Sequence, residues 1–239
     1  MLHHLIRKLE QRDALSDEEK RVLDEAVSHT RNVGPDEDLV RDGDRPSESC
    51  LILEGFTCRY KLLPDGKRQI MAIHIPGDFV DLHSFIQKRM DHGVATLTPC
   101  KVAYFPHETL RRITESHPHL ARMLWLSTLI DAGIYREWLV GMGRRSTTGQ
   151  MAHLLCELFL RLRVVGLTTD SSFQLPLTQE ELGDTLGLSL VHVNRTVQLL
   201  RSERLITWVG RTVTISDWEH LQRIADFDPT YLHLEREPR

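Results

Sequence analysis

The segment 178–202, TQEELGDTLGLSLVHVNRTVQLLRS, constrains the fold more than any other part of this chain. Thr178 and Glu181 have the spacing of a capping box, which predicts that a helix begins after this threonine. Gly187 permits a left-handed backbone conformation, and Ser189 is a favourable N-cap for a second helix. The segment therefore predicts two short helices joined by a sharp turn, which is the arrangement of a helix-turn-helix.

The second of these helices is predicted to have one buried and one exposed face. The residues expected to be buried recur at helical spacing, and they are Leu190, Val193, Val197 and Leu200. Arg195 lies near the middle of the opposite face, where a guanidinium can form two hydrogen bonds with guanine O6 and N7. An ordinary pair of helices with a solvated arginine is the structural alternative. If the motif binds DNA, the contacting residues are predicted to be Ser189, Val191, His192, Asn194, Arg195, Gln198, Arg201 and Arg211.

A hairpin is predicted to follow directly, because residues 205–215, LITWVGRTVTI, alternate apolar side chains around Gly210 and Arg211. A hairpin in this position is a wing, and its tip is expected to face the phosphate backbone. Residues 189–211 carry four arginines and one acidic residue, Glu203, although the whole chain has a formal net charge of −4. Local charge decides where DNA binds, so this segment favours DNA over the plain helix pair.

The composition is that of a globular protein, with 239 residues, 41% hydrophobic and 27% charged, enough for about two domains. No apolar run approaches the ~20 residues of a membrane span, and the start, MLHHLIRKLEQ, predicts an amphipathic helix instead of a signal peptide. We therefore expect a soluble, cytoplasmic protein with no membrane partner. The cysteines Cys50, Cys58, Cys100 and Cys156 are dispersed, which argues against a structural zinc or iron–sulfur centre.

The region before residue 117 is predicted to be mainly β. Ser16 and Glu19 form a second capping box, which opens a short helix to about Ser28. From Asp38 onward, glycine and proline turns separate short apolar runs, a pattern typical of a small antiparallel sandwich or barrel. The expected strands are CLILE (50–54), FTCRYKLL (56–63), QIMAIHI (69–75), VATLT (94–98) and KVAYF (101–105).

A long helix is predicted over residues 119–140. Its apolar residues near one face are Leu120, Leu124, Ile130, Ile134 and Trp138. Because this helix is long for a domain connector, we expect these residues to form the seam of a homodimer that delivers two DNA-reading units to a palindromic site. Packing of the helix on its own β-domain alone is the alternative. Gly141 and Gly143 are expected to form a hinge before a further helix over about 147–165.

This order of parts resembles the Crp/Fnr family of bacterial transcription regulators over nearly the whole chain. The most specific matching pieces are the turn Ile75-Pro76-Gly77-Asp78-Phe79, the segment 178–200 and the wing ending at residue 215. The resemblance implies an α+β fold with three parts. These are an antiparallel, cyclic-nucleotide-binding-like β-roll (a double-stranded β-helix) with its N-terminal helix (1–116), a dimerisation helix and hinge (117–143), and a winged helix-turn-helix with a tail (144–239).

The resemblance further implies that the protein is no enzyme and that its partners are promoter DNA, RNA polymerase and a second copy of the chain. It would activate or repress transcription. Relatives that bind cyclic nucleotides hold the phosphate with an Arg-Ser pair, and the matching positions here are Met90 and Asp91. An aspartate there would repel the phosphate, and Arg89 is the only cation nearby, so cyclic AMP is not expected to be the effector.

Two other family features differ in this chain. The oxygen sensors carry an N-terminal cysteine cluster, whereas the first cysteine here is Cys50. Val191 stands where the family's recognition helix usually has a glutamate that accepts from cytosine N4. Arg195 does match the family's base-reading arginine, so base reading is expected, but the family's half-site cannot be carried over to this chain.

An unknown small-molecule effector is expected to contact Asp78, Asp81, His83, Arg89 and Asp91 in the roll. His74 and His92 add donors that could ligate a metal or haem, but the compact spacing of two histidines and a carboxylate is missing, and we expect no cofactor. Two other function classes remain as alternatives. One is a cupin-like, metal-dependent β-roll enzyme with a regulatory C-terminal domain, and the other is a winged domain that binds protein, against which the arginines of the helix and wing argue.

Overall fold

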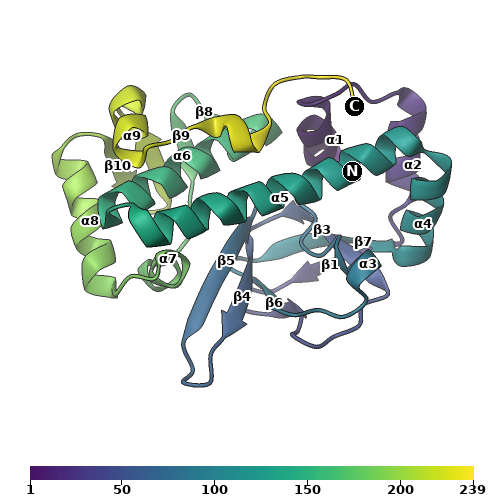
Figure 1. The fold of residues 1–239 in the computed structure, drawn as a ribbon, viewed down its shortest axis with the longest axis horizontal. Helices are drawn as coiled ribbons and strands as arrows, with labels where there is room; N and C mark the ends of the chain where they lie inside the picture. Colours follow the sequence, from purple (N-terminus) through teal and green to yellow (C-terminus); the bar gives the residue numbers. More distant parts are fainter. The chain divides into compact units, whose positions relative to one another are not determined.

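The computed structural model describes residues 1–239 as an α+β chain in two units. The roll unit comprises Met1–Lys61, Met71–Ala132 and His233–Arg239. The winged unit comprises Leu62–Ile70 and Gly133–Leu232. Figure 1 gives the element labels used below. No helix combines the length and the apolar character needed to cross a lipid bilayer.

The roll unit begins with two short helices, α1 (His3–Glu10) and α2 (Asp17–Glu25). The capping box predicted for α2 is confirmed: the Ser16 Oγ accepts from the backbone N–H of Glu19 at 3.2 Å, and the Glu19 carboxylate accepts from the Ser16 N–H at 2.8 Å. The helix ends at Glu25, before the expected end near Ser28.

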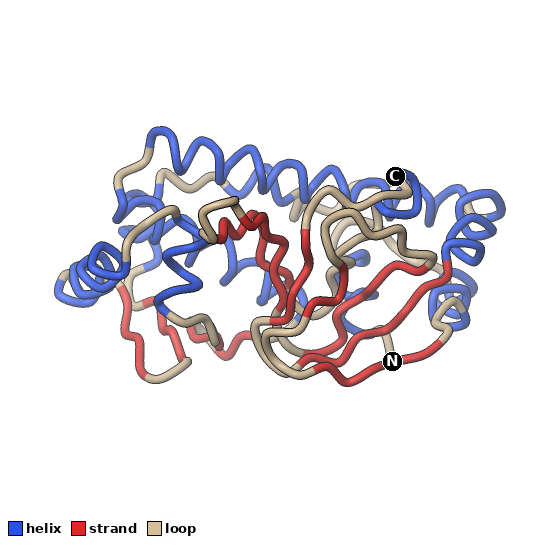
Figure 2. The backbone as a smooth tube through the Cα atoms, turned by 90° about the horizontal axis from the view of Figure 1, so that it is seen from below, coloured by secondary structure: helices blue, strands red, loops and turns tan.

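The β-roll consists of two antiparallel sheets, whose strands Figure 2 shows in red. One sheet has the order β1 (His29–Val33), β7 (Cys100–Pro106), β3 (Glu48–Glu54), and the other the order β2 (Asp38–Val40), β6 (Gly93–Thr96), β4 (Thr57–Leu62), β5 (Arg68–His74). All five expected strands are present. The sequence did not predict β1 and β2, because β1 exposes four of its five residues and β2 has only three residues.

Two apolar clusters stabilise the roll unit by removing side chains from water. One cluster lies within the roll and includes Ile52, Met90 and Val102. The other joins Leu51 and Phe105 of the sheet to residues of α1, α2, α4 (His107–Ser116) and α5 (Pro118–Arg144). A short helix, α3 (Ser84–Gln87), leads toward β6.

The long helix α5 is continuous through Gly141 and Gly143, so the expected hinge is absent from the structure. A glycine inside a helix costs only about 1 kcal/mol relative to alanine, which the packing of a 27-residue helix can offset. The boundary between the two units falls inside this helix, after Ala132. The boundary therefore lies within the expected segment 117–143.

The predicted dimer seam consists of side chains that are buried within a single chain. Its five apolar residues are each exposed by 9% or less within a single chain, and they are Leu120, Leu124, Ile130, Ile134 and Trp138. Side chains that their own chain already covers cannot offer a partner a surface. The large apolar residues of α5 that remain exposed are Trp125, Leu129, Leu139, Val140 and Met142. The helix is apolar on more than one face, and the sequence pattern selected the face that packs on its own core.

The winged unit contains α6 (Thr147–Val165), which has the predicted bounds and the Ser146 side chain as its N-cap. It is followed by α7 (Gln179–Leu186) and α8 (Leu190–Ser202). The strands β10 (Ile206–Val209) and β11 (Thr212–Ile215) join β8 (Thr168–Thr169) and β9 (Ser172–Gln174) in one sheet, with the order β10-β11-β9-β8. The last elements are α9 (Trp218–Ala225) and the 3-10 turn η1 (Pro229–Leu232).

Candidate nucleic-acid interface

The helix pair α7–α8 forms as the sequence predicts. Thr178 Oγ1 accepts from the Glu181 N–H at 3.1 Å, and the Glu181 carboxylate accepts from the Thr178 N–H at 2.6 Å. α7 ends at Gly187, which has a left-handed φ of 66° that favours glycine. The Ser189 side chain then accepts from the His192 N–H and caps α8. Two caps and one glycine therefore fix the reversal between the helices.

The predicted DNA contacts lie on α8, at its N-cap and at the tip of the wing. All eight of these residues are exposed, and they are Ser189, Val191, His192, Asn194, Arg195, Gln198, Arg201 and Arg211. The inner face buries Val193, Thr196 and Leu200. Leu190 was expected to be buried but is 51% exposed. Helical side chains point toward the N-terminus, so that of the first residue extends beyond the packed part of the helix pair.

Hydrogen bonds within the motif orient two of these side chains. Gln179 at the start of α7 donates to the Asn194 Oδ1 at 2.8 Å, which leaves the Asn194 amide nitrogen directed to other acceptors. The Ser189 Oγ lies 2.9 Å from Nδ1 of His192. In contrast, the Arg195 side chain has no partner within the chain, so its guanidinium is available to a base.

The wing also forms as predicted. β10 and β11 pair from Ile206–Ile215 to Val209–Thr212, which places Gly210 and Arg211 at the tip. Gly210 has a φ of 59°, as a tight hairpin turn requires. The Arg211 side chain is exposed and has no partner within the chain. The helix and the wing therefore present arginines on one motif, and opposite charge on DNA phosphates would attract both.

The five expected effector residues differ in burial and in their partners. The Asp78 carboxylate accepts from Lys8 Nζ at 2.6 Å and from the Ile75 N–H at 3.1 Å, so internal partners already use it. Asp81 has no exposed surface, and it accepts from the Cys50 N–H at 2.6 Å. Burial raises the pKa of Asp81 to about 7. Both carboxylates thus help to hold the roll together.

The remaining three are Arg89, Asp91 and His83. Arg89 and Asp91 are exposed, and Asp91 lies 2.6 Å from Nδ1 of His92. Burial lowers the pKa of His83 to about 3, so its ring is neutral, with its centroid 5.1 Å from that of His92. Met90 is buried in the apolar cluster of the roll. No group of three or more histidine, cysteine, aspartate or glutamate side chains is arranged to hold a metal ion.

Sequence reasoning missed the buried cation of the roll. Arg59 on β4 is only 3% exposed, and its Nε donates to the Val80 carbonyl at 2.7 Å. Its Nη2 donates to the Asp131 Oδ2 on α5 at 3.1 Å. The only signal in the sequence was an arginine inside an apolar strand segment. Asp131 is 72 residues away along the chain, so no local pattern could have linked the two.

Comparison with known proteins agrees with this architecture. Residues 30–117 match the family described as cyclic nucleotide-binding domain, and residues 149–224 match the family described as Crp-like helix-turn-helix domain. The solved structure of FixK2 from Bradyrhizobium japonicum has the same fold, with a TM-score of 0.75 and 23% identity over 82% of this chain and 96% of that chain.

Two curated relatives are similar over most of their length. The transcriptional activator protein FnrL of Cereibacter sphaeroides is 26% identical over 219 residues, which cover 90% of this chain and 88% of the relative. The transcriptional activatory protein AadR of Rhodopseudomonas palustris is 31% identical over 205 residues, 83% of this chain and 82% of the relative. With a β-roll, a long helix and an arginine-bearing winged helix-turn-helix in the same order, this chain belongs to the Crp/Fnr family of DNA-binding transcription regulators.

Proposed function

We propose that the protein binds a palindromic promoter site as a homodimer and activates transcription through RNA polymerase in the cytoplasm. The observation that carries the proposal is the exposed face of α8, where Arg195 has no partner within the chain. Activation is inferred from the names of the relatives, which are transcriptional activators. The protein acts by binding and not by catalysis, because the family consists of regulators.

The homodimer is proposed to form through the exposed stripe of α5. Trp125, Leu129, Ala132 and Leu139 follow one another at spacings of four, three and seven residues, the spacing of a two-helix seam. Trp125 is 65% exposed and Leu139 is 68% exposed in the single chain. Burial of such side chains against the same helix of a second copy removes them from water.

The roll is proposed to respond to a small molecule other than a cyclic nucleotide, and no cofactor is assigned to it. A cyclic phosphate does not fit the residues present. At the two positions that would hold it, the Met90 side chain is buried in the apolar cluster and the Asp91 carboxylate would repel it. Arg59, the buried cation, is already engaged by Val80 and Asp131. Calorimetry should therefore show no cyclic AMP binding, and a saturable isotherm would contradict this part of the proposal.

The DNA-binding function is tested by selection of a preferred site from random duplexes with the full chain. We expect a palindromic site, two chains per duplex, and an affinity that falls linearly with salt on a log–log plot. Mobility shift and light scattering on the selected duplex measure these quantities. Selection of no sequence, or binding that does not change with salt, would rule out the proposed function.

A further inference from the structure

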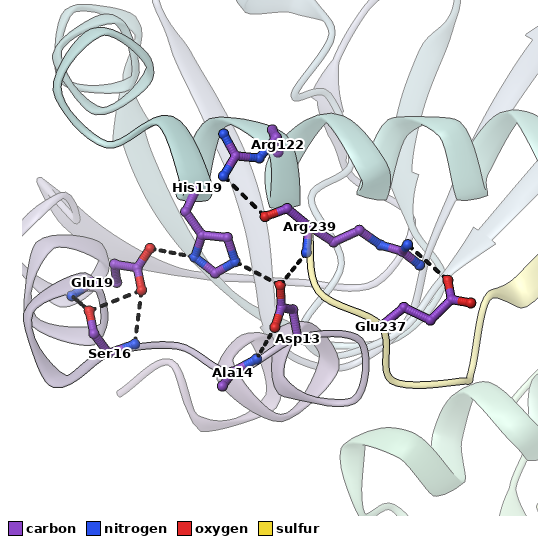
Figure 3. Close-up of polar contacts among 8 residues, drawn as sticks. All are labelled: Asp13, Ala14, Ser16, Glu19, His119, Arg122, Glu237 and Arg239. Carbon is purple, nitrogen blue, oxygen red and sulfur yellow. Dashed lines mark hydrogen bonds and ion pairs between the residues drawn. The ribbon is translucent and has the colours of Figure 1, made fainter.

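Residues 233–239 follow the last element of the winged unit but pack on the roll unit, where Figure 3 shows part of their contacts. We call residues 233–239 the strap. Four hydrogen bonds join the strap to the roll unit, and each involves the backbone of the strap. Gln11 Nε2 donates to the Leu234 carbonyl at 2.8 Å, and the Glu237 N–H donates to the Arg12 carbonyl at 2.8 Å. The Arg239 N–H donates to the Asp13 Oδ2 at 2.5 Å, and Arg122 Nη2 donates to the Arg239 carbonyl at 3.0 Å.

His119, near the start of α5, lies between two carboxylates beside the strap. Its Nδ1 is 2.6 Å from the Glu19 Oε1, and its Nε2 is 3.1 Å from the Asp13 Oδ2 (Figure 3). An ionised carboxylate only accepts hydrogen bonds, whereas a neutral imidazole has a single N–H. Both contacts are therefore satisfied together only when the ring carries two protons and a positive charge.

Both carboxylates are ionised near neutral pH. The hydrogen bond from the Arg239 N–H is the main cause that lowers the pKa of Asp13. Burial acts to raise the pKa of Glu19, but hydrogen bonds from the Ser16 N–H and from His119 lower it overall. Each carboxylate thus remains an acceptor over the range in which an imidazole titrates.

Loss of a proton from His119 should weaken the contact with Asp13 first. The contact with Glu19 is the shorter of the two, so a neutral ring keeps its proton on Nδ1. The lone pair of Nε2 then faces the Asp13 carboxylate, which is the group that holds the Arg239 N–H.

The other charged groups around this site have partners of their own. On α5, Arg122 contacts the Arg239 carbonyl, and in the strap the Arg239 guanidinium pairs with Glu237 at 2.9 Å. On α2, Lys20 pairs with Glu10 of α1 at 2.7 Å. None of these contacts involves the His119 ring.

We propose that Asp13, Glu19, His119 and Arg122 form a proton-dependent docking site for residues 233–239 of the same chain, closed when His119 is protonated and released when it is neutral. Because the strap follows η1 directly along the chain, its release frees the segment after Leu232 to move. Docking of the strap therefore responds to pH and needs no ligand. It goes beyond the proposed function, because it stands on contacts that exist without DNA.

Hydrogen–deuterium exchange of the full chain tests the proposal. The amides of Glu237 and Arg239 should be protected at about pH 5 and lose protection toward about pH 8, after correction for the intrinsic exchange rate. His119→Gln, which offers one donor and one acceptor like the neutral ring, should reduce protection at about pH 5 at least about tenfold, as expected for loss of a hydrogen bond to a charged group. Constant protection across this range, or a wild-type profile in the variant, would overturn the proposal.

Two controls separate release of the strap from general unfolding. His117→Gln makes the same substitution two positions away and should keep the wild-type profile. Amides in the middle of α5 should remain protected in His119→Gln at every pH. Arg122→Ala removes the contact to the Arg239 carbonyl without changing the histidine, so it should lower protection while keeping the pH dependence. If Arg122→Ala left the amide protection of the strap unchanged, Arg122 would not be part of the docking site and the proposed site would be wrong.

Discussion

The indole Nε1 of Trp138 donates to the Oε2 of Glu157 at 3.0 Å. Glu157 has no exposed surface, and its carboxylate also accepts from the Tyr231 hydroxyl at 3.0 Å and from Arg161 Nη1 at 2.9 Å. Burial raises the pKa of Glu157 in spite of these donors. One buried side chain of α6 thus connects α5, α6 and η1 within the winged unit.

Replacement of Glu157 by alanine should strongly destabilise the winged unit. The change leaves the Trp138 and Tyr231 donors and the Arg161 charge without their partner, and breaking a buried ion pair in this way costs about 3–5 kcal/mol. Urea denaturation followed by fluorescence measures the loss. Glu219→Ala, on the exposed side of α9, is the matched control and should change the free energy of unfolding by less than about 0.5 kcal/mol. Equal effects of the two substitutions would contradict this assignment.

Acid should destabilise the roll unit before most carboxylates titrate. Burial lowers the pKa of His74 from 6.5 to about 4. The unfolded chain then binds more protons between these two values, so stability is complete above about pH 6.5 and falls as the pH decreases toward about 4. The full shift corresponds to a loss of about 3 kcal/mol.

The contribution of His74 is isolated by a difference measurement, because the raised pKa of Asp81 acts in the opposite direction. The free energy of unfolding of wild type and His74→Asn should be measured from about pH 4 to about pH 8. The variant should lack part of the acid destabilisation, so the two curves converge as the pH falls. His3→Asn, at an exposed histidine, should follow wild type. Parallel curves for wild type and His74→Asn would exclude His74 as the cause.

Leu129→Glu should separate the proposed dimer without unfolding the chain. Leu129 is 49% exposed, so the new charge is tolerated in a monomer but lies at a twofold contact in the dimer. Light scattering should report a monomer, while circular dichroism remains that of wild type. Ile86→Glu introduces the same charge at an apolar residue of α3 that is 72% exposed, and it should leave the dimer intact. A dimer mass for Leu129→Glu would remove this stripe from the interface.

The parts that the sequence predicts well are those with local signals. The capping boxes at Ser16 and Thr178 and the turn at Gly210 each depend on residues within four positions of one another, and all three are present. The strand β1, HTRNV, has four exposed residues and one buried residue, so no alternation marks it. Its position depends on pairing with β7, which comes about 70 residues later in the chain.

The parts that the sequence misassigned depend on tertiary packing. α5 is apolar around much of its circumference, and its sequence does not show that Ile134 is buried while Leu129 is 49% exposed. In the roll, adjacent residues differ in burial, because Met90 is buried whereas its neighbours Arg89 and Asp91 are exposed. The buried pair of Arg59 and Asp131 joins distant segments. Periodicity identifies an apolar face but does not say what covers it.

Replacement of Arg195 and replacement of Arg211 by alanine should weaken DNA binding in different ways. Arg195 extends from the outward face of α8, where two hydrogen bonds to guanine are possible, so its loss should cost about 1–3 kcal/mol per half-site and flatten the preference at one base pair. Arg211 lies at the tip of the wing, where phosphates are the expected partners. Its loss should weaken binding to all sequences alike and reduce the log–log salt slope by about one for each phosphate contact removed.

The measurement is a titration of both variants against the selected palindrome and its single-base variants at several salt concentrations. Arg111→Ala is the control, because Arg111 is an exposed arginine of α4 whose partner, Glu108 Oε2, lies 3.4 Å away on the same helix. It should change neither the base preference nor the salt slope. If Arg195→Ala kept the full base preference of wild type, Arg195 would not be the residue that reads the bases. The preference would then have to come from other exposed residues of α8, such as Asn194 and Gln198, or from DNA shape.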